Sequence, residues 1–516
     1  DGLVYTVTSK LAQLEQFQDR LSVVPAADVF DQDISNSKTA ASQLNVNRVI
    51  SGSVQRTPDG LRLTVDLIDA SSGRVADSRT LDVKTASIAE LPRGVVSALT
   101  GLLRVDLSSE SRDLLMAGQT EVPAAYDFYT RAVGYLQRFE EESNIDAAIS
   151  LFGLAIKEDS TFALAYAGRG EAYLKKYGST GETAFVEEAV RDGQQAVSLG
   201  EDLPAVRNAV GRIYYTQGNY PLAELEFLRA VTTEPNDAET WRALGNVYRR
   251  QDRIDKAEES FRKAVELKPE YWLNHNELGR FYDRLGRHEE AIEPFMQVIA
   301  LRPTNPWGYN NVGVQYHNLG RLDEALGWYR KATEVNPDAV GPVALALGNM
   351  ANIHYARDEF ERAAELFDRA VTMQPKDEWA WDLLGDSRHW LGDPDGAREA
   401  WLEAPNLAEA DLEVNPLDGG MLSFAAHVQA KLGRRRDARE TLRRLQAVDR
   451  LDYFEMLDVA KVHEILGDRD SALIFVRQAF ANGAKPFIFE ASGWLDDLRQ
   501  DPAFADLASQ YRTEEE

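Results

Sequence analysis

Cysteine is absent from this chain of 516 residues. Its absence excludes disulfide bonds, thiol nucleophiles and every metal site that uses thiolate ligands. Long apolar runs are missing too, since none reaches the ~18 residues that a membrane-spanning helix needs. The first residues, Asp1-Gly2-Leu3, carry no signal-peptide pattern and no initiator Met. We therefore expect a processed or partial chain with no segment that inserts into a membrane.

The sequence also lacks the motifs of the common enzyme classes. Gly168-Arg169-Gly170 has no further glycine at the spacing of a dinucleotide-binding loop, and no P-loop occurs. His288 and His463 precede glutamates, but neither has the second histidine four residues later that a zinc protease needs. The protein-kinase triplets His-Arg-Asp and Asp-Phe-Gly are missing. We therefore expect no enzyme activity, no catalytic or metal-binding residues and no cofactor.

Positive charge is scarce. The 84 acidic residues outnumber the 57 basic ones, which gives a net charge of −27. Residues 1–105 contain 12 acids and 11 bases, so nearly all of the excess lies after residue 105. Such a surface repels phosphate backbones, which argues against nucleic acid as a ligand and favours basic partners. The alternative is that the acidic surface only keeps a long chain soluble.

What the sequence does have is a repeat of 34 residues. Five series of residues recur at this step in one phase, and they comprise prolines, alanines, glycines and two sets of aromatics. The members are Pro235, Pro269, Pro303 and Pro337; Ala223, Ala257, Ala291 and Ala325; Gly211, Gly245, Gly279 and Gly313; Tyr214, Tyr248, Tyr282 and Tyr316; and Phe227, Phe261, Phe295 and Tyr329.

Each copy predicts two helices joined by a polar turn. In the copy from 238 to 271, Leu244 and Tyr248 lie four residues apart and share one helix face. Gly245 allows the second helix to approach closely, and Phe261 on that helix lies among small residues. Pro269 ends the second helix because proline cannot continue it. One pair cannot bury its apolar face alone, so neighbouring copies must stack.

The order Trp, Leu-Gly, Tyr, Ala, Phe, Ala and Pro over 34 residues resembles the tetratricopeptide repeat (TPR). The resemblance implies a mostly α fold, an α-solenoid of about ten helix–turn–helix repeats in a right-handed superhelix. We expect a linker at 106–124, the repeats at 125–486 and capping helices at 487–516. Extra residues interrupt the phase at 177–181, 340–343 and 413–417. The repeats start near Ala125, Ala163, Pro204, Ala238, Trp272, Pro306, Ala344, Glu378, Gly419 and Tyr453.

Residues 1–105 predict a separate small α/β domain. Helices are expected at 3–20, 37–44 and 87–104, and strands at 21–24, 48–55, 61–70 and 74–83. Ser51-Gly52-Ser53-Val54, the alternating run from Leu61 to Ala70, and Gly73 make the segment similar to the TolB-N-terminal-like or FlgO-like domain. That family's first strand would precede Asp1 and is missing here.

This second resemblance implies the sensory or interaction region of a bacterial signalling protein. In such proteins the module precedes TPR arrays in serine/threonine kinases and adenylate-cyclase-type regulators. The compartment stays open, with a periplasmic location favoured over a cytoplasmic one.

In TPR arrays the first helix of each repeat lines a concave groove, so the resemblance also implies where partners bind. Arg and Asn side chains suit the carboxylates and amides of a peptide. Arg242 and Asn246 resemble the start of a carboxylate clamp, but Glu277, Trp307 and Asn311 break its pattern. The alternative is that such residues only line a wet channel. By phase, the groove residues are Asn208, Arg212, Tyr215, Arg242, Asn246, Arg249, Asn276, Arg280, Asp283, Asn310 and His317.

The sequence therefore favours a protein–protein interaction scaffold that binds protein or peptide partners, extended or basic segments in particular. The alternative is a self-assembling structural subunit, a filament or oligomer joined through the solenoid ends and an exposed edge of the N-terminal sheet. His317, His389 and His427 fall on first-helix positions of different repeats, and we expect them to be packing residues without a shared metal.

Overall fold

The structure is a computed structural model. The chain divides into two compact units, Asp1–Pro303 and Thr304–Glu516, and the domain boundaries placed above at 105, 124 and 486 stay predictions. Of the helix expected at 3–20, the structure describes only residues 11 and 14, and the described residues 21, 23 and 24 of the strand expected at 21–24 form no strand. Within those residues, no helix is long and apolar enough to cross a membrane. The structure describes residues 11, 14, 21, 23–24, 29, 34, 36–44, 46–84, 91–108, 117–136, 139, 142–414, 417–448, 451–484, 489 and 493–511.

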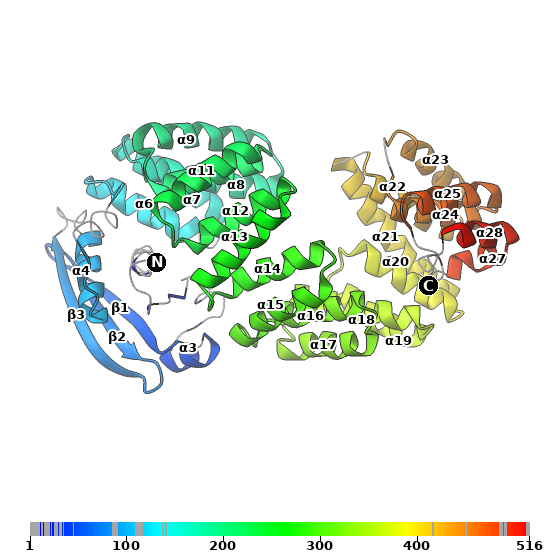
Figure 1. The fold of residues 1–516 in the computed structure, drawn as a ribbon, viewed down its shortest axis with the longest axis horizontal. Helices are drawn as coiled ribbons and strands as arrows, with labels where there is room; N and C mark the ends of the chain where they lie inside the picture. Colours follow the sequence, from blue (N-terminus) through cyan, green and yellow to red (C-terminus); the bar gives the residue numbers. More distant parts are fainter. Residues whose placement is uncertain are drawn as a thin grey trace. The chain divides into compact units, whose positions relative to one another are not determined.

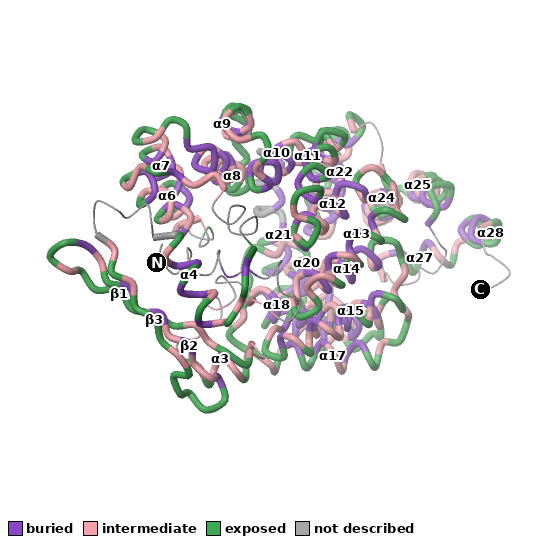
Figure 2. Tube along the Cα trace, turned by 60° about the vertical axis from the view of Figure 1, so that its left-hand side comes forward, coloured by how far each residue is buried: buried purple, intermediate pink, exposed green. Residues whose placement is uncertain are grey.

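The first unit opens with a three-stranded antiparallel sheet of order β1-β2-β3, formed by the strands expected at 48–55, 61–70 and 74–83 (Figure 1). The strands are β1 (Arg48–Thr57), β2 (Gly60–Asp69) and β3 (Arg74–Lys84), preceded by α3 (Ser37–Gln43) and followed by α4 (Leu91–Leu103). Leu63 and Val65 on β2 are buried against Val95 and Leu99 of α4. Strand β1 is mostly exposed (Figure 2), so the core of this sheet lies between β2 and α4.

After α4, ten more helices of the first unit follow in the described residues, and consecutive helices pack as antiparallel pairs. The first of them also contacts the sheet, because Tyr126 is buried in the same core as Val65. The pairs are α6 (Pro123–Leu136) with α7 (Glu142–Glu158), α8 (Ala163–Thr180) with α9 (Ala184–Gly200), α10 (Pro204–Thr216) with α11 (Tyr220–Thr233), α12 (Ala238–Arg250) with α13 (Ile254–Leu267), and α14 (Trp272–Arg284) with α15 (His288–Leu301).

The second unit continues the pattern with five more pairs in its described residues, so the predicted solenoid of about ten repeats is confirmed. It ends with η2 (Gly493–Leu495), α27 (Asp496–Arg499) and α28 (Pro502–Tyr511). The pairs are α16 (Pro306–Asn318) with α17 (Leu322–Val335), α18 (Val340–Ala356) with α19 (Phe360–Met373), α20 (Glu378–Trp390) with α21 (Pro394–Val414), α22 (Gly419–Lys431) with α23 (Arg435–Leu445), and α24 (Tyr453–Ile465) with α25 (Arg469–Ala481).

The glycine of each regular repeat is required by contact with the aromatic ring 16 residues later. A Cβ on Gly245 would lie 2.8 Å from Phe261, and one on Gly313 would lie 2.6 Å from Tyr329. Both rings are almost fully buried. The glycine therefore brings the two helices of a repeat into van der Waals contact, which is the packing that the sequence pattern predicted.

Side chains at the start of the first helices satisfy backbone amides that have no partner within the helix. Asp237 accepts from the amide of Glu239 at 3.1 Å, and Asn305 accepts from that of Trp307 at 3.0 Å. Asp452 and Glu455 form a full capping box on α24. These caps mark the start of the repeats that have them, whereas α8, α10, α14 and α18 begin without a side-chain cap.

The insertions extend helices, which the sequence pattern did not predict. The repeat phase predicts an insertion at 177–181 before the second helix, but α8 runs unbroken to Thr180. The four residues 340–343 form the first turn of α18, and part of the third insertion lengthens α21 to Val414. Four residues are close to one helical turn of 3.6 residues, so they add length while the buried face stays in register.

Candidate functional site

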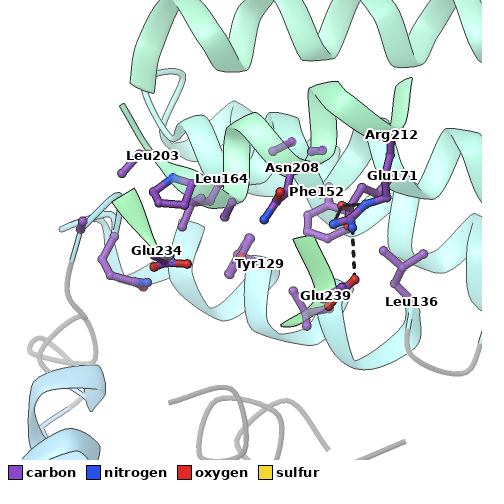
Figure 3. Close-up of a pocket in the computed structure, with 18 residues that line it drawn as sticks. Tyr129, Leu136, Phe152, Leu164, Glu171, Leu203, Asn208, Arg212, Glu234 and Glu239 are labelled. Carbon is purple, nitrogen blue, oxygen red and sulfur yellow. Dashed lines mark hydrogen bonds and ion pairs between the residues drawn. The ribbon is translucent and has the colours of Figure 1, made fainter. Parts of the chain in front are cut away.

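A cavity of about 310 Å³ lies in the first unit where the first helices of four successive repeats come together (Figure 3). Helices α6, α8, α10 and α12 each contribute side chains to it. Val133, Leu136 and Leu164 form apolar parts of its wall. Polar groups share the same wall, namely those of Tyr129, Glu171, Asn208, Arg212, Glu234 and Glu239.

The charged groups of this cavity are organised around Arg212. Its guanidinium lies 2.6 Å from a carboxylate oxygen of Glu171 and 3.1 Å from one of Glu239 (Figure 3). Arg212 lowers the pKa of Glu239. Burial opposes the charge of Arg212, but the two glutamates raise the pKa of Arg212 overall. Two carboxylates of the cavity wall thus share one cation, and Glu234 lines the same wall.

Two of the predicted groove residues, Asn208 and Arg212, line the cavity. Asn208 is buried, accepts from Thr240 Oγ1 at 2.8 Å and donates to Asp237 Oδ2 at 3.3 Å. Arg212 is engaged by its glutamates, so its charge is already balanced within the chain. Tyr215, one turn further on α10, packs its ring against Tyr220 with centroids 5.6 Å apart.

The predicted groove residues on α12 form hydrogen bonds with neutral groups rather than with carboxylates. Arg242 donates to the neutral Asn274 Oδ1 at 3.0 Å, and Asn246 accepts from Arg249 Nη2 at 3.3 Å. Among the described residues, Arg249 has no carboxylate within ion-pair distance. Burial and the nearby Arg284 lower the pKa of Arg249.

The remaining predicted residues do not join the cavity. Arg280 on α14 is exposed and pairs with Glu277 at 3.2 Å, and Asn276 and Asp283 are half-buried on the same helix. Asn310 and His317 belong to the second unit. Asn310 is almost fully buried and accepts from Asn349 at 3.3 Å. His317 contacts the edge of the Tyr329 ring, and burial lowers the pKa of His317.

Sequence reasoning missed the acidic residues of the cavity. Glu171 directly follows Gly170, just as the predicted Arg212 directly follows Gly211. The repeat phase would therefore have found Glu171 if acids had been included with Arg and Asn. Tyr129 was also missed; it is buried deeply enough to raise the pKa of its hydroxyl.

A second polar cluster lies in the second unit and was not predicted. The Lys431 side chain is completely buried, and its ammonium lies 2.9 Å from Asp382 Oδ2 and 2.8 Å from Asp386 Oδ1. Two carboxylates thus share one cation. Burial, together with the neighbouring Asp386, raises the pKa of Asp382 to about 7 even though Lys431 lowers it. The described residues contain no group of His, Asp and Glu that could hold a metal ion.

His427 in this region gives a prediction for pH dependence. It is buried, its Nε2 has no hydrogen-bond partner among the described residues, and burial with Lys431 and Lys461 lowers its pKa far below 6.5. As the pH falls below about 6.5, His427 therefore binds a proton in the unfolded chain but not in the folded chain. This histidine's contribution to stability is complete above pH 6.5 and falls as the pH drops, by at most ~1.4 kcal/mol per pH unit.

The replacement His427→Gln should remove this histidine's part of the dependence of stability on pH, while Asp382, Lys431 and Lys461 remain in place. Urea unfolding of both proteins between pH 5 and 8 measures the difference. Parallel pH curves for the two proteins would contradict the assignment.

Three family models match this chain, and all three describe the tetratricopeptide repeat. One matches residues 242–306 and 349–410, another 306–376 and the third 422–444. These segments are tetratricopeptide repeats. The matches agree with the helix pairs from α12 to α23 in both units.

Similarity to individual proteins is local. A TPR repeat-containing protein of Pseudomonas aeruginosa is 51% identical over 41 residues, which is 8% of this chain and 39% of that protein's length. The structure of a tetratricopeptide repeat protein from Parabacteroides merdae aligns with 59% of this chain over 97% of its own length, at 14% identity and a TM-score of 0.37. PilF of Pseudomonas aeruginosa covers 42% of this chain and 93% of its own, at 17% identity and a TM-score of 0.33. TPR repeats generally act as scaffolds for protein or peptide partners.

Proposed function

We propose that this chain is a protein-interaction scaffold whose first unit binds an extended, basic segment of a partner in the cavity between α6, α8, α10 and α12. The observation that carries the proposal is the charge of the wall, where the carboxylates of Glu171 and Glu239 share the guanidinium of Arg212. A lysine or arginine of the partner would meet these carboxylates while its aliphatic stem lies against Leu136.

We assign the neighbouring first-helix residues to the rest of the same partner segment. Arg249 supports this, because it is half-buried and has no carboxylate at ion-pair distance among the described residues. A carboxylate of the partner would supply the negative charge that Arg249 lacks at ion-pair distance. Asn310 and His317 lie in the second unit and are left out of this site. The assigned residues are Asn208, Arg212, Tyr215, Arg242, Asn246, Arg249, Asn276 and Arg280.

The test is binding of a fluorescein-labelled pentalysine peptide, measured by fluorescence anisotropy at about 0.15 M salt. The double variant Glu171→Gln/Glu239→Gln should bind it about tenfold more weakly, the effect of losing ~1.4 kcal/mol. The matched control Glu182→Gln/Glu187→Gln removes the same charge from exposed positions outside the cavity. It should bind within twofold of the unaltered chain. Equal weakening in both variants would mean that the peptide only senses net charge, and the cavity would lose its role.

We further propose a place for the scaffold in bacterial signalling or envelope assembly. The support is the similarity of residues 1–105 to the TolB-N-terminal-like or FlgO-like domain, together with the observed run of three antiparallel strands followed by α4. Sequencing the coding region upstream of Asp1 tests this, since a kinase or cyclase domain there supports signalling and a signal peptide supports the envelope.

A second candidate function is self-assembly through the N-terminal sheet. No strand among the described residues pairs with the outer edge of β1 or of β3, and Val54 and Val75 on these strands are exposed. Edge strands of this kind add strands from other chains. Light scattering across concentration tests the idea. A mass that grows, and that Val54→Lys returns to that of a monomer, would support it, whereas a constant monomer mass would rule it out.

A further inference from the structure

In the C-terminal segment of the second unit, the side chain of Trp494 packs outside the core formed by the segment's other apolar residues. Leu495 and Leu498 are completely buried in a cluster with Phe489 and Phe504, which holds η2, α27 and α28 against α24 and α25. Trp494, the residue before Leu495, packs instead against the cluster built mainly by α21 and α22. Two adjacent side chains therefore belong to different clusters, and of the two only Leu495 packs in the core of the C-terminal segment.

Trp494 is bound as a ligand would be, by both its polar and its apolar surfaces. Its indole Nε1 donates to Asp386 Oδ2 at 3.0 Å across 108 residues of sequence. Its ring stacks on His389, with centroids 4.9 Å apart and planes 18° apart. The ammonium of Lys431 lies 5.6 Å from the ring centroid, within the range of a cation–π contact. The side chain nevertheless stays partly exposed.

The repeats form this site without help from Trp494. Asp386 already accepts from Trp401 Nε1 at 3.0 Å and from Lys431 at 2.9 Å. The neighbouring Trp390 donates its own indole N–H to Tyr355 at 3.1 Å. Removal of Trp494 therefore leaves no buried charge and no buried donor without a partner. This distinguishes the site from an ordinary core contact, in which neighbours depend on one another.

The backbone before Trp494 also lies close to the site. A Cβ on Gly493 would lie 2.7 Å from the Trp390 ring, so the main chain rests directly on that indole. A segment can enter in this way only where a small residue precedes the tryptophan. The site therefore selects a short sequence, a small residue followed by tryptophan, and not apolar surface in general.

We propose that the surface formed by Asp386, His389, Trp390, Trp401 and Lys431 is a binding site for a partner segment in which a small residue precedes an exposed tryptophan. Trp494 occupies the site in cis, so the partner competes with the chain's own C-terminal segment. The site lies wholly within the second unit and is independent of the cavity proposed for basic segments in the first. Its ligand differs in kind, since it is aromatic and donates an N–H to a carboxylate.

The test uses the full chain and a fluorescein-labelled peptide Gly-Trp-Leu-Asp-Asp-Leu-Arg, which reproduces residues 493–499. The variant Trp494→Ala should bind the peptide at least tenfold more tightly than the unaltered chain, because the competing side chain is gone. Adding His389→Ala removes the stacking face while Asp386 and Lys431 keep their pairing, and binding should be lost. A peptide with phenylalanine in place of tryptophan should also fail, since it has no N–H for Asp386.

Two further variants keep the proposal falsifiable. Gly493→Ala should also raise affinity for the peptide, because the added methyl group forces the segment off Trp390 while Trp494 remains. Leu495→Ala should instead destabilise the whole C-terminal cap. We expect Trp494→Ala to unfold cooperatively in urea, with a midpoint near that of the unaltered chain.

Three results would overturn the proposal. One is loss of folding of the second unit in Trp494→Ala, which would make Trp494 an essential core residue. The second is equal peptide binding by Trp494→Ala and the unaltered chain, or none by either. The third is a dimer of the unaltered chain that Trp494→Ala dissociates, which would make a second copy the occupant.

Discussion

Replacing Lys431 with alanine is expected to lower the free energy of unfolding of the second unit by about 3–5 kcal/mol. The ammonium is completely buried and holds the carboxylates of Asp382 and Asp386, which are themselves 7% and 4% exposed. Without it, two buried carboxylates face each other and lose the cation that both of them contact, and at least one must take up a proton or draw water into the core. Urea unfolding followed by circular dichroism measures the loss.

The loss arises from the stranded acids, so it should be reversible by removing them. The triple variant Lys431→Met/Asp382→Asn/Asp386→Asn should regain most of the lost stability, because neutral groups of similar shape do not require a cation. The exposed Lys376 provides the control, since Lys376→Ala should change stability by less than about 0.5 kcal/mol. A cost below about 1 kcal/mol for Lys431→Ala would show that the buried trio is not the electrostatic centre of this unit.

The second large effect is expected at the close contact between the two helices of a repeat. Gly313→Ala should cost about 1–3 kcal/mol. The new Cβ would lie 2.6 Å from two carbons of the Tyr329 ring, which is fully buried and has no room to turn aside. The helices α16 and α17 would have to separate, and every apolar contact between them would weaken. Thermal and urea unfolding measure the effect.

The same repeat contains its own control. Gly327 lies within α17, and a Cβ there would meet no atom within 4 Å. Gly327→Ala should therefore stabilise the protein by about 0.5–1 kcal/mol, through lower backbone entropy in the unfolded chain. If both alanines stabilise, the ring of Tyr329 moves freely and the glycine is not a packing requirement. If both destabilise, the helices tolerate no substitution here and the ring is not the reason.

The sequence by itself determined the solenoid. Glycine, alanine, aromatic residues and proline recur every 34 residues in a fixed phase, and each acts on nearby residues. Gly313 contacts Tyr329 within one helix pair, and Pro306 starts a helix. Alternation of Leu63, Val65 and Leu67 with polar residues likewise predicted the strand β2 and its buried face. Contacts within one repeat or one hairpin span few residues, so spacing alone predicts them.

Only the tertiary structure decided which polar groups meet. Arg212 was expected in the groove, but its pairing with Glu171, 41 residues away, depends on how two repeats stack. Lys431 meets Asp382 and Asp386 across 49 and 45 residues, and Trp494 reaches Asp386 across 108. The helical period predicts the face of a side chain, whereas its partner depends on the small rotation between successive repeats, which adds up over several of them. The insertions at 177–181 and 340–343 show the same limit, because extra residues read as interruptions of the repeat became extra helical turns.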